Sequence, residues 1–297
     1  MKLEIEHLRK EYGEKVALHD FNITLEEGIY GILGPNGAGK STLMNLLTDN
    51  LKRTSGNILV NGKEILSMGK EYRAMLGYVP QQQGFYEHFS AEGFLKYVGK
   101  LKGCSNAELK KQVPELLASL NLYEKRFEKI GSFSGGMKQR VLIAQSLLGN
   151  PKIIIMDEPT AGVDPQERIR IRNFISQIAE NRIILVATHI VSDVESIARE
   201  ILLMKNGRMQ EKGTPSELMR KIQPYIYEIQ IDSQQQKEVM ETYLVSNVRQ
   251  GIEGIKVKII TKVKPEQYPH MVAPANLEDV YLYYFEHKTS NPTSTNV

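Results

Sequence analysis

The chain has 297 residues, which allows one large domain or a main domain with an appendage. A hydrophobic content of 41% and a charged content of 25% are ordinary for a soluble globular protein, and a net charge of +3 is too small to indicate nucleic acid as the main partner. The single cysteine, Cys104, excludes an internal disulfide framework, and no apolar run approaches the roughly 18 residues of a membrane span.

The beginning of the chain alternates apolar and polar residues, as short half-buried strands do. In residues 1–30, for example, Phe21, Ile23 and Leu25 are separated by polar side chains. Residues 56–80 show strand signals again. We therefore expect an antiparallel β subdomain near the N-terminus and further strands up to residue 80.

A glycine-rich loop lies between these segments. It fits the pattern G-x-x-x-x-G-K-[ST] and stands between an apolar strand and a helical pattern. In such a loop the glycines let the backbone approach a phosphate, Lys40 reaches the β- and γ-phosphates, and the Ser41 hydroxyl can ligate Mg²⁺. The pattern predicts a nucleotide-phosphate site formed by Gly34, Pro35, Asn36, Gly37, Ala38, Gly39, Lys40, Ser41 and Thr42.

Residues 83–145 have a helical pattern. Ser90 can cap a helix that has Phe94, Leu95, Val98 and Leu101 on one face, and a second helix is expected from Asn106 to Leu120. The flanking segments alternate strands with helices, which indicates a parallel α/β sheet. The helical block is therefore expected to be an insertion into that sheet.

The helical block contains a second glycine-rich loop, in the stretch SFSGGMKQR. Ser134, Gly135 and Gly136 precede a helical pattern, and free N–H groups at a helix N-terminus together with the helix dipole attract anions. This loop has no lysine placed as Lys40 is in the first loop. It has the chemistry to hold a phosphate but cannot act as a complete site by itself.

An apolar strand at Ile153–Met156 ends in two carboxylates, Asp157 and Glu158. Ligands bind at the carboxyl ends of parallel strands, so both acids are expected beside the phosphate loop. Asp157 suits Mg²⁺, directly or through water, and Glu158 suits activation of an attacking water. Without that loop, an acidic strand end is equally compatible with a helix cap or a surface position.

Three more residues point to function only in combination with these motifs. His189 follows the predicted strand Ile183–Thr188 and could contact a γ-phosphate, although a lone histidine is more often structural or exposed. Gln81 follows a strand-like run and could ligate Mg²⁺ or hold water; alone it indicates nothing. Tyr12 could stack on a base, or be a half-exposed strand tyrosine.

The predicted fold class is α/β: a P-loop NTPase (RecA-like) core with an N-terminal antiparallel β subdomain and an inserted helical subdomain. It is expected to occupy residues 1–220, with the helical subdomain at about 83–145. Residues 221–288 are predicted to form a small C-terminal α+β appendage, because YIYEIQID and IKVKIITK alternate like strands and Asn276 can cap a short helix. The polar residues 289–297 are expected to be disordered.

Together and in this order, the motifs resemble the nucleotide-binding subunit of ABC transporters over residues 1–220. The resemblance implies base stacking by Tyr12, a Walker A loop at residues 34–42 and a Q-loop glutamine at Gln81. It further implies a signature at Phe133–Met137, a Walker B aspartate and catalytic base at Asp157 and Glu158, a D-loop at Ala161–Asp164 and a switch histidine at His189.

Two motifs depart from the family pattern. The signature often ends in Gln, and here it begins with Phe133 and ends with Met137. The D-loop often begins with Ser, and Ala161 supplies no hydroxyl at that position. Neither change removes a charge or the phosphate-facing Ser134, so activity is expected to persist.

The resemblance also implies ATP and Mg²⁺ as ligands, a transmembrane permease as partner, and a homodimer or heterodimer of two ATPase subunits. ATP then lies between the Walker A loop of one subunit and Ser134, Gly135, Gly136 and Asp164 of the other. No nucleic acid is expected, and the protein is expected to be cytoplasmic and peripheral on the inner face of the cell membrane, which it contacts only through the permease.

Two other functions, a non-transport ABC protein and a monomeric P-loop kinase, fit the sequence less well. A non-transport member acting on ribosomes or DNA usually carries two cassettes or long coiled coils, and this sequence contains one phosphate loop, one signature and no such heptads. A monomeric P-loop kinase leaves the signature unexplained. The tail LEDVYLYYF is similar to those of exporter-type ATPases, which favours export, although the tail itself is also explained as a packing or dimer-stabilising appendage.

Overall fold

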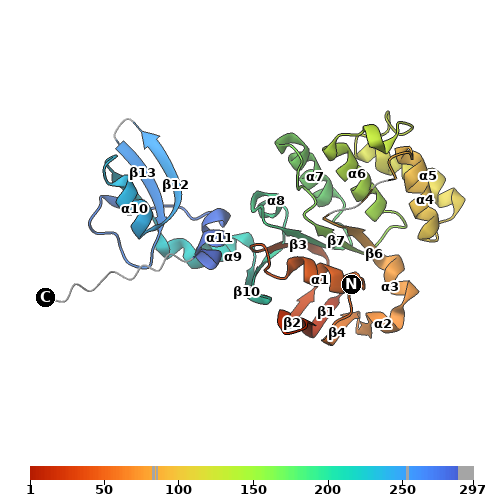
Figure 1. Cartoon of the computed structure of the whole chain (residues 1–297), viewed down its shortest axis with the longest axis horizontal. Helices are drawn as coiled ribbons and strands as arrows, with labels where there is room; N and C mark the ends of the chain where they lie inside the picture. Colours follow the sequence, from red (N-terminus) through yellow and green to blue (C-terminus); the bar gives the residue numbers. More distant parts are fainter. Residues whose placement is uncertain (82–83, 85, 252–253, 287–297) are drawn as a thin grey trace. The chain divides into compact units, whose positions relative to one another are not determined.

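The computed structural model describes residues 1–81, 84, 86–251 and 254–286. The chain divides into two compact units, Met1–Met209 and the residues from Gln210 onward (Figure 1). This division comes before the predicted boundary at residue 220. Helix α9 (Pro215–Ile222) packs on α11 (Leu277–Phe285), so it belongs with the second unit.

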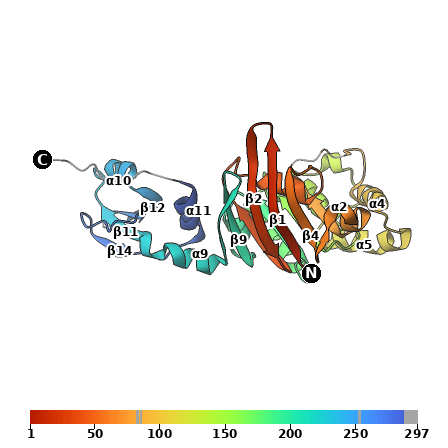
Figure 2. The same cartoon turned by 90° about the horizontal axis from the view of Figure 1, so that it is seen from below.

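The N-terminal sheet of the first unit is antiparallel, as its alternating sequence predicted. Its strand order is β2-β1-β4-β5, and Figure 2 shows its first strands in red and orange. The apolar side chains Leu3, Ile5 and Leu8 are buried on one face of it. The strands are β1 (Leu3–Tyr12), β2 (Lys15–Leu25), β4 (Ser55–Val60) and β5 (Lys63–Glu64).

The expectation of strands throughout residues 56–80 was wrong in part. Two short helices, α2 (Ile65–Met68) and α3 (Lys70–Met75), lie between β5 and β6 (Leu76–Val79). The Glu64 carboxylate caps α2 by accepting a hydrogen bond from the backbone N–H of Leu66 at 2.7 Å. A side-chain cap of this kind starts a helix where apolar composition alone indicates a strand.

A second sheet has six strands in the order β10-β9-β3-β8-β7-β6. Four pairs in this sheet are parallel: β3–β8, β3–β9, β7–β8 and β6–β7. This confirms the α/β fold class. It also sets β3, which leads into the phosphate loop, beside β8, which leads to His189. Every residue of β7 and β8 is buried, as in sheets covered on both faces. The strands are β3 (Gly28–Leu33), β7 (Ile153–Asp157), β8 (Ile183–Thr188), β9 (Glu200–Lys205) and β10 (Arg208–Gly213).

Helices cover this sheet. Helix α1 (Lys40–Leu47) contacts β7 and β8 on one side and β2 on the other, between the two sheets (Figure 1). The predicted helices of the inserted block are confirmed, since Ser90 caps α4 and Ser105 forms a capping box before α5. The remaining elements are α4 (Ala91–Leu101), α5 (Asn106–Ser119), η1 (Ile130–Ser132), α6 (Gly135–Ser146), α7 (Pro165–Gln177) and α8 (Ser192–Glu195).

The second unit is a small α+β structure. Its antiparallel sheet has the order β12-β13-β11-β14, and both stretches predicted to be strands are confirmed in β11 and β13. Asn276 caps α11 by accepting from the N–H of Asp279 at 2.8 Å, also as predicted. The elements are η2 (Gln223–Tyr225), β11 (Ile226–Ile231), α10 (Gln236–Thr242), β12 (Leu244–Gly251), β13 (Gly254–Ile260) and β14 (His270–Val272).

The sequence also predicted a disordered tail and the absence of a membrane span. The tail at 289–297 lies outside the described residues. Within the residues that are described, no helix combines the length and apolar character needed to cross a membrane.

Candidate nucleotide site

The loop between β3 and α1 needs glycine at two positions. A Cβ on Gly34 would lie 2.2 Å from the carbonyl oxygen of Met204. Gly39 has φ +102°, and a Cβ there would lie 2.9 Å from the carbonyl oxygen of Ala17. Backbone carbonyls cannot move aside as a flexible side chain can, so these two glycines let the loop close against its neighbours.

Lys40 folds back over this loop. Its Nζ donates to the carbonyl oxygens of Gly34 at 2.6 Å and Pro35 at 3.2 Å, and the side chain is buried. Burial lowers the pKa of Lys40, an effect that the nearby Glu158 and Asp157 oppose. The lysine is therefore a fixed positive charge at the start of α1 rather than a solvated one.

The N-terminus of α1 is open to an anion. Its cap residue is Gly39, no side chain caps it, and its first turn contains no acidic residue. The first backbone N–H groups of a helix have no partner within the helix, and the dipole favours negative charge there. Together with Lys40, this helix end is suited to a phosphate group.

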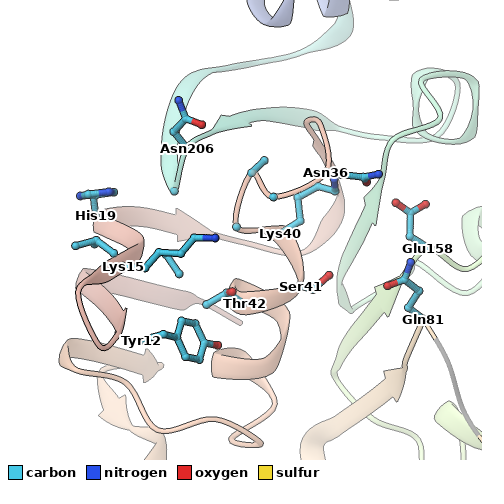
Figure 3. Close-up of a pocket in the computed structure, with 16 residues that line it drawn as sticks. Tyr12, Lys15, His19, Asn36, Lys40, Ser41, Thr42, Gln81, Glu158 and Asn206 are labelled. Carbon is cyan, nitrogen blue, oxygen red and sulfur yellow. The ribbon is translucent and has the colours of Figure 1, made fainter.

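A cavity of about 640 Å³ surrounds the loop. Figure 3 shows Tyr12 and His19 toward one end and Glu158 and Gln81 toward the other, with Ser41 between them. The structure thus brings together residues that are far apart in sequence. The lining residues are Tyr12, Lys15, Val16, Ala17, His19, Asn36, Gly37, Ala38, Gly39, Lys40, Ser41, Thr42, Gln81, Glu158, Asn206 and Gly207.

Sequence reasoning missed the turn between β9 and β10 as part of this wall. Gly207 donates from its N–H to the Ala38 carbonyl at 2.9 Å, and its own carbonyl accepts from the His19 N–H at 2.9 Å. The Asn206-Gly207 dipeptide is a turn signal that could have predicted the hairpin. Its contact with the phosphate loop depends on strand order, which no local signal reports.

Glu158 is held at the end of the cavity by the last residue of β8 and the residue that follows it. Its Oε1 is 2.8 Å from Nδ1 of His189, and its Oε2 accepts from the Thr188 hydroxyl at 3.1 Å. The parallel register, with Asp157 opposite Ala187, brings these strand ends together. Glu158 also has φ +52°, a conformation that is uncommon for a residue with a side chain.

The residues at the strand end also fit a magnesium ion. Asp157 is buried, and its Oδ1 has no hydrogen-bond partner among the described residues. Burial raises the pKa of Asp157, against the opposing effect of a hydrogen bond from Ser41. A lone carboxylate with a hydroxyl suits Mg²⁺, which takes few protein ligands and completes its shell with phosphate and water. The described residues contain no cluster of three or more His, Cys, Asp or Glu that could hold a metal.

Comparison with known proteins identifies the family. A family model described as ABC transporter matches residues 18–161. An uncharacterized ABC transporter ATP-binding protein of Bacillus subtilis (strain 168), YxlF, is 34% identical over 82% of this chain and 79% of its own length. The chain belongs to the ABC transporter ATP-binding proteins. Members of this family are ATPases, so the chain is an ATP-binding cassette ATPase.

Other relatives have more informative names. The linearmycin resistance ATP-binding protein LnrL of Bacillus subtilis (strain 168) is 36% identical over 74% of this chain and 71% of its own length. The Nod factor export ATP-binding protein I of Ralstonia nicotianae is 30% identical over 94% of this chain and 92% of its own.

Solved structures show the same architecture. An ATP-binding subunit of an ABC transporter superposes with a TM-score of 0.67 at 29% identity, over 74% of this chain and 93% of that one. A dimeric ATP-binding cassette in a post-hydrolysis state, with ADP and Pi, superposes with a TM-score of 0.64 at 26% identity, over 71% and 98%. The P-loop NTPase core is thereby confirmed.

The predicted signature lies outside the cavity of its own chain. Ser134 is exposed and caps α6, its hydroxyl oxygen accepting from the N–H of Met137 at 3.3 Å. Neither Ser134 nor the following Gly135 and Gly136 lines the cavity. The single chain therefore does not unite its two glycine-rich loops.

Asp164 of the predicted D-loop also lies outside the cavity. Its Oδ1 accepts from the N–H of Glu167 at 3.0 Å and so caps α7. Glu167 in turn forms an ion pair with Arg140 of α6 at 3.1 Å. This ion pair joins α6, which begins at the predicted signature, to α7, which follows the predicted D-loop.

Proposed function

We propose that this ATPase powers export through a separate membrane permease and that ATP is bound between two ATPase subunits. One observation carries the proposal: the phosphate loop and Glu158 share a cavity, whereas Ser134 and Gly135 are exposed on the same chain and do not line that cavity. A second subunit facing the first would bring an exposed signature to that cavity. Either two identical or two different ATPase subunits satisfy this geometry.

In this arrangement Tyr12 stacks on the adenine base, and Lys40 with the N-terminus of α1 binds the phosphates. Glu158 accepts a proton from the water that attacks the γ-phosphorus, and His189 holds the Glu158 carboxylate through their 2.8 Å contact. Ser41 and Asp157, with Gln81, would hold Mg²⁺, which when bound offsets charge on the β- and γ-phosphates. Ser134, Gly135, Gly136 and Asp164 complete the site of the partner subunit.

Pairing of two ATPase subunits is supported by the match to a cassette that was solved as a dimer with ADP and Pi. ATP would favour the closed pair because it contacts both subunits at once, and loss of the γ-phosphate contacts would remove that advantage.

Export is inferred from the names of two relatives, a linearmycin resistance protein and a Nod factor export protein. We further propose that the chain acts in the cytoplasm and is peripheral on the inner face of the cell membrane, which it would contact only through its permease.

The substitution Glu158→Gln tests the catalytic assignment. It replaces the carboxylate with an amide of the same shape, so ATP should still bind while turnover falls about a hundredfold or more, the range for loss of a general base. ATP binding and phosphate release by the full-length chain would be measured beside Glu180→Gln, which alters an exposed glutamate outside the cavity. Undiminished phosphate release by Glu158→Gln would rule out the assignment.

A further inference from the structure

The segments that follow Glu158 and His189 are joined a second time, away from the nucleotide cavity. The hydroxyl of Thr160 donates a hydrogen bond to Oδ2 of Asp193 in α8. Thr160 is 1% exposed and Asp193 is 3% exposed. Neither residue lines the cavity, so this contact is distinct from the one between Glu158 and His189.

Stability alone is a poor explanation for the Thr160–Asp193 pair. The second carboxylate oxygen of Asp193, Oδ1, is buried and has no hydrogen-bond partner within the described part of the chain. Burying a carboxylate with an unsatisfied oxygen costs free energy that an apolar pair of similar size would avoid. A buried polar contact of this kind instead fixes the relative position of the two segments that it joins.

The two segments carry the catalytic contact. Thr160 follows Glu158 by two positions, and Glu158 is in the uncommon φ +52° conformation. Such a conformation persists only where the surroundings over-determine it. The other segment is further fixed from α7, since Nη1 of Arg172 donates to the carbonyl oxygen of Ser192 at 2.8 Å.

We propose that Thr160 and Asp193 are a pair of positioning residues that sets the contact between Glu158 and His189. The pair fixes the backbone after Glu158 against the helix after His189, and the 2.8 Å catalytic contact depends on that spacing. The inference rests on the proposed role of Glu158 as the base. Loss of the hydroxyl should slow the chemical step and leave ATP affinity unchanged.

The test uses the full-length chain and measures kcat and KM for ATP in Thr160→Val, with Thr160→Ser as the matched control. Valine keeps the volume but removes the donor, whereas serine keeps it. We expect kcat to fall about tenfold or more in Thr160→Val, as misplacement of a catalytic group does. KM should remain within about twofold, and Thr160→Ser should recover most of the lost kcat, because the donor is restored without a change in the binding groups.

A second arm separates positioning from folding. Combined with His189→Ala, Thr160→Val should lower kcat much less than it does alone, because the contact it sets is already gone. A kcat of Thr160→Val equal to that of the unmodified chain would overturn the proposal, as would equal loss in the serine variant or a full additional loss in the His189→Ala background. If Glu158→Gln lowers turnover while Thr160→Val does not, only this inference fails; if Glu158→Gln turns over normally, the proposed function fails.

Discussion

The two glycine-rich loops of this protein share a sequence character but differ in environment. Both lie at the start of a helix, but Gly39 caps α1, whereas Gly135 and Gly136, which were expected to precede a helix, are the first two residues of α6. In the first loop Lys40 is buried and bonded to two loop carbonyls, and the helix N-terminus is uncapped and faces a cavity. In the second, the Ser134 hydroxyl oxygen accepts a hydrogen bond from the N–H of Met137, and Ser134 and Gly135 are exposed.

This difference supports the proposal that one loop is the main phosphate site and that the other contributes to a shared site. Phosphate binding by a single chain needs a concave surface and a fixed positive charge, and only the first loop has both. The second loop offers glycine backbone and a hydroxyl on an open surface. It therefore needs another surface opposite it, which agrees with pairing of two subunits.

The largest expected effect comes from Ser134→Arg. The larger side chain would prevent a second subunit from closing over the γ-phosphate, so ATP-driven dimerisation and turnover should fall about a hundredfold or more, as when a required transition-state contact is removed. ATP affinity of the single chain should be unchanged. Dimerisation would be measured in the Glu158→Gln background by light scattering.

The matched control for this test is Ser132→Arg, which adds the same charge two positions earlier at another exposed residue. Normal ATP-driven dimerisation of Ser134→Arg would contradict the shared site, and so would equal loss in both variants, because the effect would then not depend on the position of Ser134.

Lys40→Ala should weaken ATP binding to the single chain. Hydrogen bonds to charged groups contribute about 1.5–3 kcal/mol, so the affinity should fall roughly 10- to 100-fold. Lys138, which follows the signature, provides the comparison, and Lys138→Ala should leave the affinity of the single chain unchanged. Calorimetric titration of both variants with ATP would check this. Equal losses of affinity in the two variants would mean that the first loop is not the main phosphate site of the single chain.

The smallest expected effect concerns stability. Because burial raises the pKa of Asp157 in the folded chain above its ordinary value, the ionised form is disfavoured in the folded state at neutral pH. Asp157→Asn should therefore raise the melting temperature of the nucleotide-free chain at pH 7 by a few degrees, roughly 2–4 °C per kcal/mol. The gain should shrink as the pH falls through the folded pKa, where the unmodified Asp157 becomes protonated.

Thermal melts in the absence of nucleotide from pH 7 downward would measure this gain. Asp164→Asn is the control on the signature side, since asparagine retains the α7 cap and the side chain is exposed. A lower melting temperature for Asp157→Asn at pH 7 would show that the buried carboxylate is stabilised by more than its burial costs.

Local patterns were sufficient for much of the fold. The caps Ser90 of α4 and Asn276 of α11 were predicted from a few neighbouring residues, and the buried strands β7 and β8 were recognised by short apolar runs. Helices α2 and α3 were missed because short helices have too few residues for a helical period to stand out from an apolar strand-like run.

The sequence by itself determined the chemistry of this protein: a phosphate loop with Lys40 and Ser41, carboxylates at a strand end, and a second glycine-rich loop without a lysine. The motif order alone identified the family. These features are encoded in a few adjacent residues, because backbone conformation and side-chain chemistry there are local.

Only the tertiary structure decided which of these residues meet. The order of strands in the sheet brings Glu158 beside His189, puts the Asn206-Gly207 turn against the phosphate loop and buries the Thr160–Asp193 pair. It also leaves Ser134 on an open surface. Such contacts join residues far apart in the chain and depend on how whole strands and helices pack, which no short stretch of sequence specifies.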